Sequence, residues 1–373
     1  MLGIIAMAFG IYFAWKKSRQ ILTPPIASQR QMTDDQRLPP LAEKKLKIIS
    51  DQPIFDYWIY RPGFGAFATS TGTITGDSIV FYLNQEGKIF QVKKDGEDEA
   101  ITSEPIENLQ SVKATSDGKY ILIKFGDRNF AEFSVFNSES KIFQMLPENT
   151  TAAAFSLDGK QIAYLDKTGL FIKELAGAKP KTLKILSFNQ RDFDLDWILP
   201  EVVVLTSKPS AFAKSSLWSL NVKNKTFQPL SIIDFEGLMV NWSVDAGVKN
   251  KSGLQFNSRL EGREGSLTLI NEKGEKQASF NFLTLPNKCF FSSPQIYCAV
   301  PSEIPAQTIL PDDYLKKAFY SNDSIYQIDI DKNSFTEILG AGNPIIDAVK
   351  LRFSDGKLFF INRYDNKLYQ LDL

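Results

Sequence analysis

The chain has 373 residues, and its 43 basic and 43 acidic side chains give a formal net charge of zero. Hydrophobic residues make up 43% of the chain, enough to bury a core, while the balanced charge provides no basic surface for nucleic acid. There is no histidine, which excludes Ser-His-Asp and Cys-His catalysis and histidine-ligated metals. We therefore expect a protein that is not an enzyme and that carries no cofactor or metal.

The first predicted element is an apolar segment at the amino terminus. Residues 2–15 read LGIIAMAFGIYFAW without a charge, and Lys16, Lys17 and Arg19 follow. A helix of this length spans roughly 21 Å, against a hydrocarbon core of about 30 Å, so a buried core helix and a cleaved signal peptide are alternatives. Because a polar stretch follows and no A-x-A-like cleavage site closes the segment, we interpret residues 1–17 as an uncleaved membrane anchor. It is either short or truncated by a start codon placed too late.

Two signals disagree on the membrane side of the rest of the chain. The positive-inside rule places the side that carries Lys16, Lys17 and Arg19 in the cytoplasm, although a missing basic segment upstream would reverse that orientation. The two cysteines favour the outside, and we predict a membrane-anchored, extracytoplasmic domain. Between anchor and domain, residues 18–43 contain two Pro-Pro pairs and many polar residues, which predicts a semi-extended stalk.

A repeated turn marks the remainder of the chain, residues 44–373. The turns read TSDGK at 115–119, SLDGK at 156–160 and SDGK at 354–357, and an alternating strand follows each. Asp-Gly supplies the positive φ that reverses a chain between two strands, and the preceding Ser or Thr can hydrogen-bond turn backbone. One carboxylate per turn is too few for a metal-binding loop. A period of roughly 40–50 residues with β content is typical of propellers.

Seven alternating segments predict the third strands of seven blades. They are KIFQV (88–92), AEFSVF (131–136), LFIKEL (170–175), SLWSLNV (216–222), SLTLI (266–270), SIYQIDI (324–330) and KLYQLDL (367–373). The blades are expected at about 61–104, 105–148, 149–189, 190–235, 236–286, 287–343 and 344–373. Since the chain stops after the seventh third strand, we predict that residues 44–52 supply its fourth strand and close the ring.

The motif F-S-x-D-G-K with its following strand, and blade endings such as SIYQIDI and KLYQLDL, resemble the WD40-like β-propeller repeat of TolB-type bacterial proteins. The resemblance covers roughly residues 44–373 and is strongest at 113–124, 154–165 and 352–373. The stalk-plus-propeller layout is similar to uncharacterised membrane-anchored propellers of bacteria with reduced genomes. This resemblance implies an all-β, seven-bladed propeller that binds proteins or small ligands, and it brings no catalytic residues with it.

The two cysteines, Cys289 and Cys298, flank FFSSPQIY. If Ser293-Pro294 is a two-residue loop, the two sulfur atoms face each other across a hairpin and are close enough for a disulfide. The alternative is a pair of reduced thiols in the sheet core. A disulfide would indicate an oxidising compartment.

Long segments between second and third strands are the candidate binding site. They span residues 207–216, 257–265 and 300–323 in blades 4, 5 and 6, and long loops in compact domains are usually functional or disordered. The candidate contact residues are Tyr314, Phe319 and Tyr320, with Arg259 and Arg263 on the neighbouring blade. Alternatively, these aromatic side chains fold their loop back onto the ring.

These patterns predict a membrane-anchored binding module that presents the loop face of blades 4–6 to a protein or a cell-envelope polymer. One alternative is a non-catalytic structural subunit of an envelope assembly. Another is a glycan- or peptide-acting enzyme, which would need paired carboxylates about 5–10 Å apart at the central channel. No pair in the sequence demands that chemistry.

Overall fold

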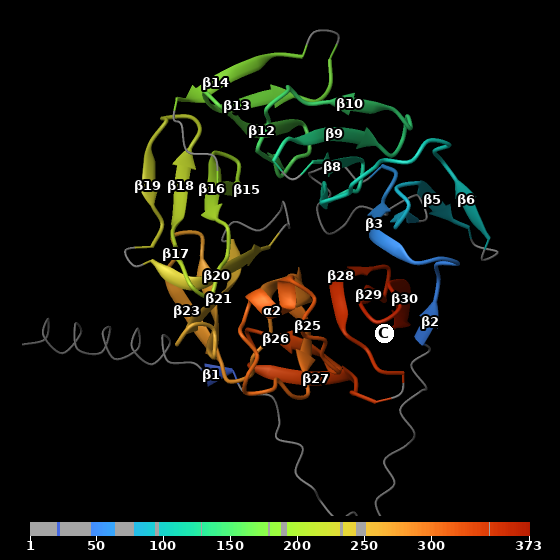
Figure 1. The fold of residues 1–373 in the computed structure, drawn as a ribbon, viewed down its shortest axis with the longest axis vertical. Coiled ribbons are helices and arrows are strands. Elements are labelled where there is room, and N and C mark those ends of the chain that lie inside the picture. The colour runs from blue at the N-terminus through green and yellow to red at the C-terminus, as the bar shows by residue number, and fades with distance from the viewer. Residues whose placement is uncertain are drawn as a thin grey trace, which may run out of the picture.

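The computed structural model describes residues 21–22, 46–63, 78–93, 97–127, 129–177, 180–187, 192–231, 234–243, 251–342 and 344–373. Its strands form seven sheets around a central axis (Figure 1), which confirms the all-β, seven-bladed propeller. The predicted anchor, residues 1–17, lies outside the described residues. Within the described ranges, no helix is long and apolar enough to cross a bilayer.

Blades 1–6 take their four main strands from consecutive stretches of chain, and the first strands of blades 2–7 line a central cavity. Blades 1 and 2 comprise β3 (Ile54–Tyr60), β4 (Ile79–Asn84), β5 (Ile89–Val92) and β6 (Asp98–Ala100), then β7 (Ser111–Ala114), β8 (Tyr120–Gly126), β9 (Ala131–Asn137) and β10 (Phe143–Met145). Blades 3 and 4 comprise β11 (Ala152–Phe155), β12 (Gln161–Asp166), β13 (Gly169–Glu174) and β14 (Thr182–Leu186), then β15 (Phe193–Leu199), β16 (Val202–Ser207), β18 (Leu217–Asn221) and β19 (Phe227–Pro229).

The remaining blades follow the same order, with additions in blade 5. Blade 5 comprises β20 (Phe235–Trp242), β21 (Ser252–Arg259), β22 (Glu264–Asn271) and β23 (Lys276–Phe280), extended by β17 (Lys214–Ser215) beside β20 and by β1 (Ile21–Leu22) beside β23. Blade 6 comprises β24 (Cys289–Ser292), β25 (Gln295–Pro301), β26 (Asp323–Asp329) and β27 (Ser334–Leu339). Blade 7 comprises β28 (Ala348–Ser354), β29 (Lys357–Asn362), β30 (Lys367–Asp372) and β2 (Leu46–Ile48). All seven predicted third strands are present.

The ring closes as the sequence predicts, because β2 pairs antiparallel with β30 as the outer strand of blade 7. The Ile49 amide donates to the Leu368 carbonyl at 2.9 Å, and the Leu368 amide donates to the Ser50 hydroxyl at 3.0 Å. Figure 1 shows β2 beside β30 although the two strands lie at opposite ends of the sequence. This pairing joins the two ends of the folded region in one sheet.

The predicted start of blade 1, residue 61, is wrong. Its first strand is β3, which begins at Ile54. Alternation fails as a signal here because β3 is buried on both faces. Tyr57 packs toward blade 7, and Trp58 packs toward blade 2.

One element falls within the segment predicted as a stalk. The two residues of β1 pair parallel with β23, Ile21 opposite Ser279 and Leu22 opposite Phe280. An outer strand presents unpaired backbone groups to any extended segment that passes it, so an extended chain at this edge of blade 5 adds to the sheet.

The Asp-Gly turns have the predicted geometry. Gly118 has φ +67° and Gly159 has φ +65°. The Asp117 carboxylate accepts from the Lys119 amide at 2.9 Å, and the Thr115 hydroxyl accepts from the Tyr120 amide at 3.1 Å. A Cβ added at Gly118 would lie 2.1 Å from the Ile59 carbonyl oxygen, so this turn requires glycine for its conformation and for its contact with blade 1.

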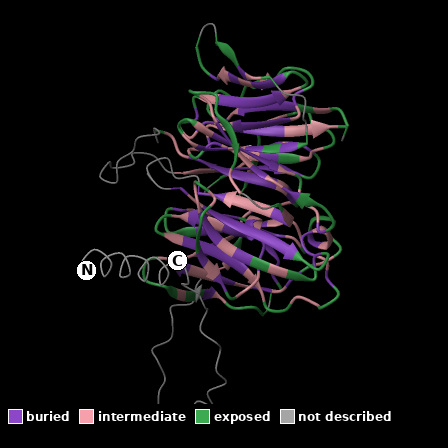
Figure 2. Cartoon of the chain, turned by 90° about the vertical axis from the view of Figure 1, so that its left-hand side faces the viewer, coloured by how far each residue is buried: buried purple, intermediate pink, exposed green. Residues whose placement is uncertain are grey.

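The hydrophobic core lies between neighbouring blades, and Figure 2 shows buried strands with exposed connections at their ends. Strand β15 illustrates how the sequence divides between core and channel. Phe193, Leu195 and Trp197 are buried against blade 3, while Asp194 and Asp196 alternate with them and line the central cavity. The alternating FDLDW sequence therefore faces core on one side and channel on the other.

Candidate functional site

A buried ion network holds the long segment of blade 6 on the ring. The Lys288 ammonium lies 2.7 Å from the Asp323 carboxylate and 2.6 Å from that of Asp347, and all three side chains are almost fully buried. Arg363 of blade 7 also binds Asp347 at 2.9 Å and donates to the Tyr314 carbonyl oxygen at 3.2 Å. Two cations therefore balance two carboxylates beneath the loop.

Tyr314 is part of this network, so the prediction that it is an exposed contact residue is wrong. It lies in the short helix α2 (Asp312–Leu315), is 4% exposed, and its hydroxyl donates to Asp347 at 3.4 Å. The Arg363 guanidinium lies 3.9 Å from the ring centre. Burial raises the pKa of Tyr314 to about 12, with Lys288 opposing the shift. Phe319 is half-buried against the core of blades 5 and 6. Tyr314 and Phe319 therefore fit the alternative expectation, in which the aromatic side chains fold their loop back onto the ring.

The other three predicted contact residues reach the surface. Tyr320 is 39% exposed, and its ring centre lies 5.5 Å from that of Tyr364. Arg259 and Arg263 are exposed on blade 5. The predicted loop at 257–265 is instead a four-residue turn, because β21 and β22 stay paired as far as Arg259 and Glu264.

The connections of blades 4, 5 and 6 touch one another. The Ala211 amide of blade 4 donates to the Asp312 carboxylate of α2 at 2.7 Å, and the Leu310 amide donates to the Gly262 carbonyl at 2.9 Å. Gly262 has φ +86°, and a Cβ there would come within 2.8 Å of the Ala211 Cβ, so glycine permits the close approach. We call residues 207–216, 260–263, 302–322, 345 and 363–364 the loop platform.

Apolar side chains are exposed on the loop platform of every contributing blade. They are Phe212 at 60%, Leu260 at 64%, Leu315 at 45%, Ile345 at 53% and Tyr364 at 49%. Connections after second and fourth strands leave the same face of the ring, because successive strands run antiparallel. Sequence analysis missed these five residues, since they come from separate segments of the chain and only the packing of the loops groups them.

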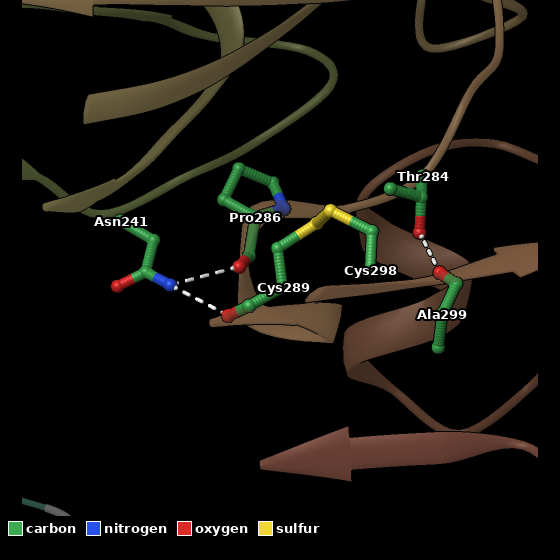
Figure 3. Close-up of a disulfide and its surroundings, with 6 residues drawn as sticks. All are labelled: Asn241, Thr284, Pro286, Cys289, Cys298 and Ala299. Atoms are coloured by element: carbon green, nitrogen blue, oxygen red, sulfur yellow. Dashed lines mark hydrogen bonds between the residues drawn. A yellow bond between two sulfur atoms is a disulfide. The ribbon is translucent and has the colours of Figure 1, made fainter. Parts of the chain in front are cut away.

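The cysteines lie in the predicted register, with Cys289 opposite Cys298 and Phe291 opposite Ile296. Their sulfur atoms are joined in a disulfide between β24 and β25 (Figure 3). Both residues are buried in the core shared by blades 5 and 6. The Asn241 side-chain amide of blade 5 donates to the Cys289 carbonyl at 2.9 Å, which ties the bridged hairpin to its neighbour.

We expect the purified chain, denatured without reductant, to be lighter than its reduced form by the mass of two hydrogen atoms. The reason is the bond between Cys289 and Cys298, the chain's two cysteines. Intact-mass spectrometry after thiol alkylation measures it, with the Cys298→Ser variant as the control that cannot form this bridge. Two alkyl groups on the unreduced chain would contradict the prediction.

The second candidate site is the central channel, a cavity of about 450 Å³ lined by the first strands of blades 2–7. The Lys113 ammonium lies 2.8 Å from the Leu195 carbonyl oxygen and 3.2 Å from the Asp196 carboxylate. Lys350 of blade 7 pairs at 2.9 Å with Asp56, which is buried. The size is within the usual range for small-molecule sites.

The electrostatics of the channel favour recognition over proton transfer by Lys113. Burial opposes its charge, but the carboxylates of Asp196 and Asp194 outweigh that effect and raise the pKa of Lys113. The ammonium therefore stays protonated at neutral pH and is a poor general base. Within the described part of the chain, no cluster of three acidic or cysteine side chains forms a metal site.

Asp194 and Asp196 are two carboxylates that line the central cavity, and sequence analysis did not single them out. They stand two residues apart on one face of β15. The available signal was the alternation of FDLDW, in which two acidic residues on one face mark a polar lining. Asp196 is engaged by Lys113, so the two carboxylates have different surroundings.

No protein-family model matches the chain, and no curated protein matches its sequence. Solved structures with similar folds are WD40 and other β-propellers. The Cps50 (Swd1) propeller domain of Myceliophteria thermophila is 8% identical, with a TM-score of 0.52 and coverage of 88% of this chain and 100% of that one. The carboxy-terminal WD40 domain of Sif2 is 12% identical, with a TM-score of 0.48 and coverage of 86% and 82%.

A third similar structure is an enzyme. A catalytically inactive virginiamycin B lyase from Staphylococcus aureus, solved with quinupristin, is 12% identical, with a TM-score of 0.49 and coverage of 89% of this chain and 100% of that one. At 8% identity, the likeness to the Cps50 domain establishes the β-propeller fold alone. The finer TolB-type resemblance stays a prediction.

Proposed function

We propose that the protein is a membrane-anchored binding module that uses the loop platform to hold a protein partner. The observation that carries the proposal is the set of exposed apolar side chains on adjoining connections, Phe212, Leu260 and Leu315. Apolar and aromatic residues grouped on one surface are typical of protein interfaces. The anchor at residues 1–17 would keep the platform near the membrane.

The platform has the rigidity that a recognition surface needs. Its blade 6 segment rests on the buried pairs of Lys288 and Arg363 with Asp347, and contacts between loops fix the segments of blades 4 and 5. Pre-organised loops lose little conformational entropy on binding. Exposed Arg259 and Arg263 add a polar rim beside the apolar residues.

We further propose that the propeller faces an oxidising compartment. The Cys289–Cys298 disulfide supports this location, because such bonds persist mainly outside the reducing cytoplasm. The partner is then a protein of the same compartment.

The test replaces the apolar platform residues together, as Phe212→Ser, Leu260→Ser and Leu315→Ser, in the full anchored chain. Each lost apolar side chain is expected to weaken partner binding by about 1–2 kcal/mol, so the triple variant should lose at least about a hundredfold in affinity. Crosslinking in native membranes, followed by purification and mass spectrometry, measures capture of the partner.

A matched control uses exposed apolar residues away from the platform, as Ile142→Ser, Leu183→Ser and Phe227→Ser near or within the outer strands of blades 2–4. This control should capture the same partner as the natural chain. Equal capture by both triple variants, with unchanged thermal melting, would refute the platform as the binding surface.

A further inference from the structure

Among the described residues, the central channel holds one cation and one anion that form no ion pair. Two ion pairs at the channel join side chains of the protein itself, Lys113 with Asp196 and Lys350 with Asp56. Among the residues that the structure describes, neither Arg352 nor Asp194 makes a side-chain hydrogen bond or an ion pair, and both line the cavity.

Arg352 is the less satisfied of the two. Its Nε atom is buried without a hydrogen-bond partner among the described residues, and its guanidinium carbon lies 5.8 Å from the centre of the Tyr57 ring. A partly buried guanidinium without a counter-ion is costly, because desolvation is not offset by pairing. A carboxylate is the group whose two oxygen atoms match the guanidinium.

The two unpaired charges lie on different sides of the channel. Arg352 belongs to β28 of blade 7, and Asp194 belongs to β15 of blade 4. At least two blades separate them in either direction around the ring. A ligand that serves both must therefore carry its negative and positive groups at opposite ends.

Three large apolar side chains contribute to the wall of the channel, together with polar ones. Phe155, Met239 and Phe290 line the cavity from blades 3, 5 and 6. Together with the cavity volume of about 450 Å³, this lining suits a molecule of a few residues with an apolar middle.

From these observations we infer that the channel binds a small zwitterion of the short-peptide type. Its carboxylate is held by Arg352, its ammonium by Asp194, and its apolar side chains by Phe155, Met239 and Phe290. This site is separate from the loop platform and extends the proposed protein-binding role with a second, small-molecule ligand.

Isothermal titration calorimetry of the full chain with the dipeptide alanyl-leucine tests the inference. Two modified probes, the N-acetylated dipeptide and the dipeptide amide, each remove one charge. We expect saturable binding of the free dipeptide, and binding at least about tenfold weaker for each modified probe, since each loses a charge-assisted contact.

Two variants test which residue binds the ammonium end of the dipeptide and which binds the carboxylate end. Asp194→Asn should bind the free and the acetylated dipeptide equally, and Arg352→Gln should bind the free dipeptide and its amide equally. Arg259→Gln, beside the loop platform, should bind as the natural chain does, and the triple platform variant should keep dipeptide binding even where partner capture is lost.

Three results would overturn the inference. They are the absence of saturable heat at millimolar dipeptide, equal affinity of the natural chain for all three probes, and unchanged discrimination in both channel variants. Because the modified probes are measured on the natural chain, the test stands even if a variant fails to fold.

Discussion

A chain that begins at residue 53 is expected to melt about 10 °C lower than one that begins at residue 44. The shorter chain lacks β2, whose pairing with β30 closes the ring. It loses roughly four backbone hydrogen bonds at about 1 kcal/mol each, and each kcal/mol corresponds to about 2–4 °C in a domain of this size class. Differential scanning calorimetry measures the difference.

The two chains form a matched pair, because both lack the segments predicted as anchor and stalk and differ only in residues 44–52. The shorter chain also exposes the free edge of β30 in blade 7, so we expect it to aggregate at lower concentration. Equal melting temperatures would contradict the view that β2 completes blade 7.

Replacing Lys288 by methionine is expected to cost about 3–5 kcal/mol and to lower the melting temperature by roughly 10 °C. Burial opposes the charge of Lys288, but Tyr314, Asp323 and Asp347 outweigh it and raise the pKa of this ammonium. The variant leaves the carboxylates of Asp323 and Asp347 buried with Arg363 as their remaining cation, and that imbalance destabilises the loop platform first. Thermal melting and hydrogen exchange over residues 302–322 measure the two effects.

Lys316→Met is the matched control, because it removes a lysine whose side chain is 68% exposed and whose ion pair with Asp312 is solvent-accessible. We expect a loss below about 1 kcal/mol there. Adding Asp323→Asn to Lys288→Met should restore part of the lost stability, since one uncompensated buried charge is removed. A single Lys288→Met variant as stable as the natural chain would show that the buried pairs are dispensable.

Local signals were sufficient for the repeating part of the fold. The alternation of the seven third strands and the Asp-Gly turns depend on side chains a few residues apart, which periodicity reports directly. The closure by β2 also followed from the sequence, because a final blade with three strands requires a fourth. Strand β3 escaped detection since its burial between two neighbouring blades removes the alternation.

The candidate sites depended on contacts that no local pattern contains. Tyr314 looks like an exposed loop aromatic in the sequence, but Lys288, Asp347 and Arg363, distant along the chain, bury it. Conversely, Phe212 and Leu315 become neighbours on one surface only when the loops of blades 4 and 6 meet.

Sequence therefore specified the seven blades of this protein, because turn geometry and the pairing of consecutive strands are short-range properties. It also specified the closing strand, because a last blade with three strands requires a fourth. Tertiary structure decided which residues are offered to other molecules. Burial and charge pairing are set by residues from different blades, and among the residues that the structure describes these long-range contacts give Arg352 and Asp194 no ion pair in the channel.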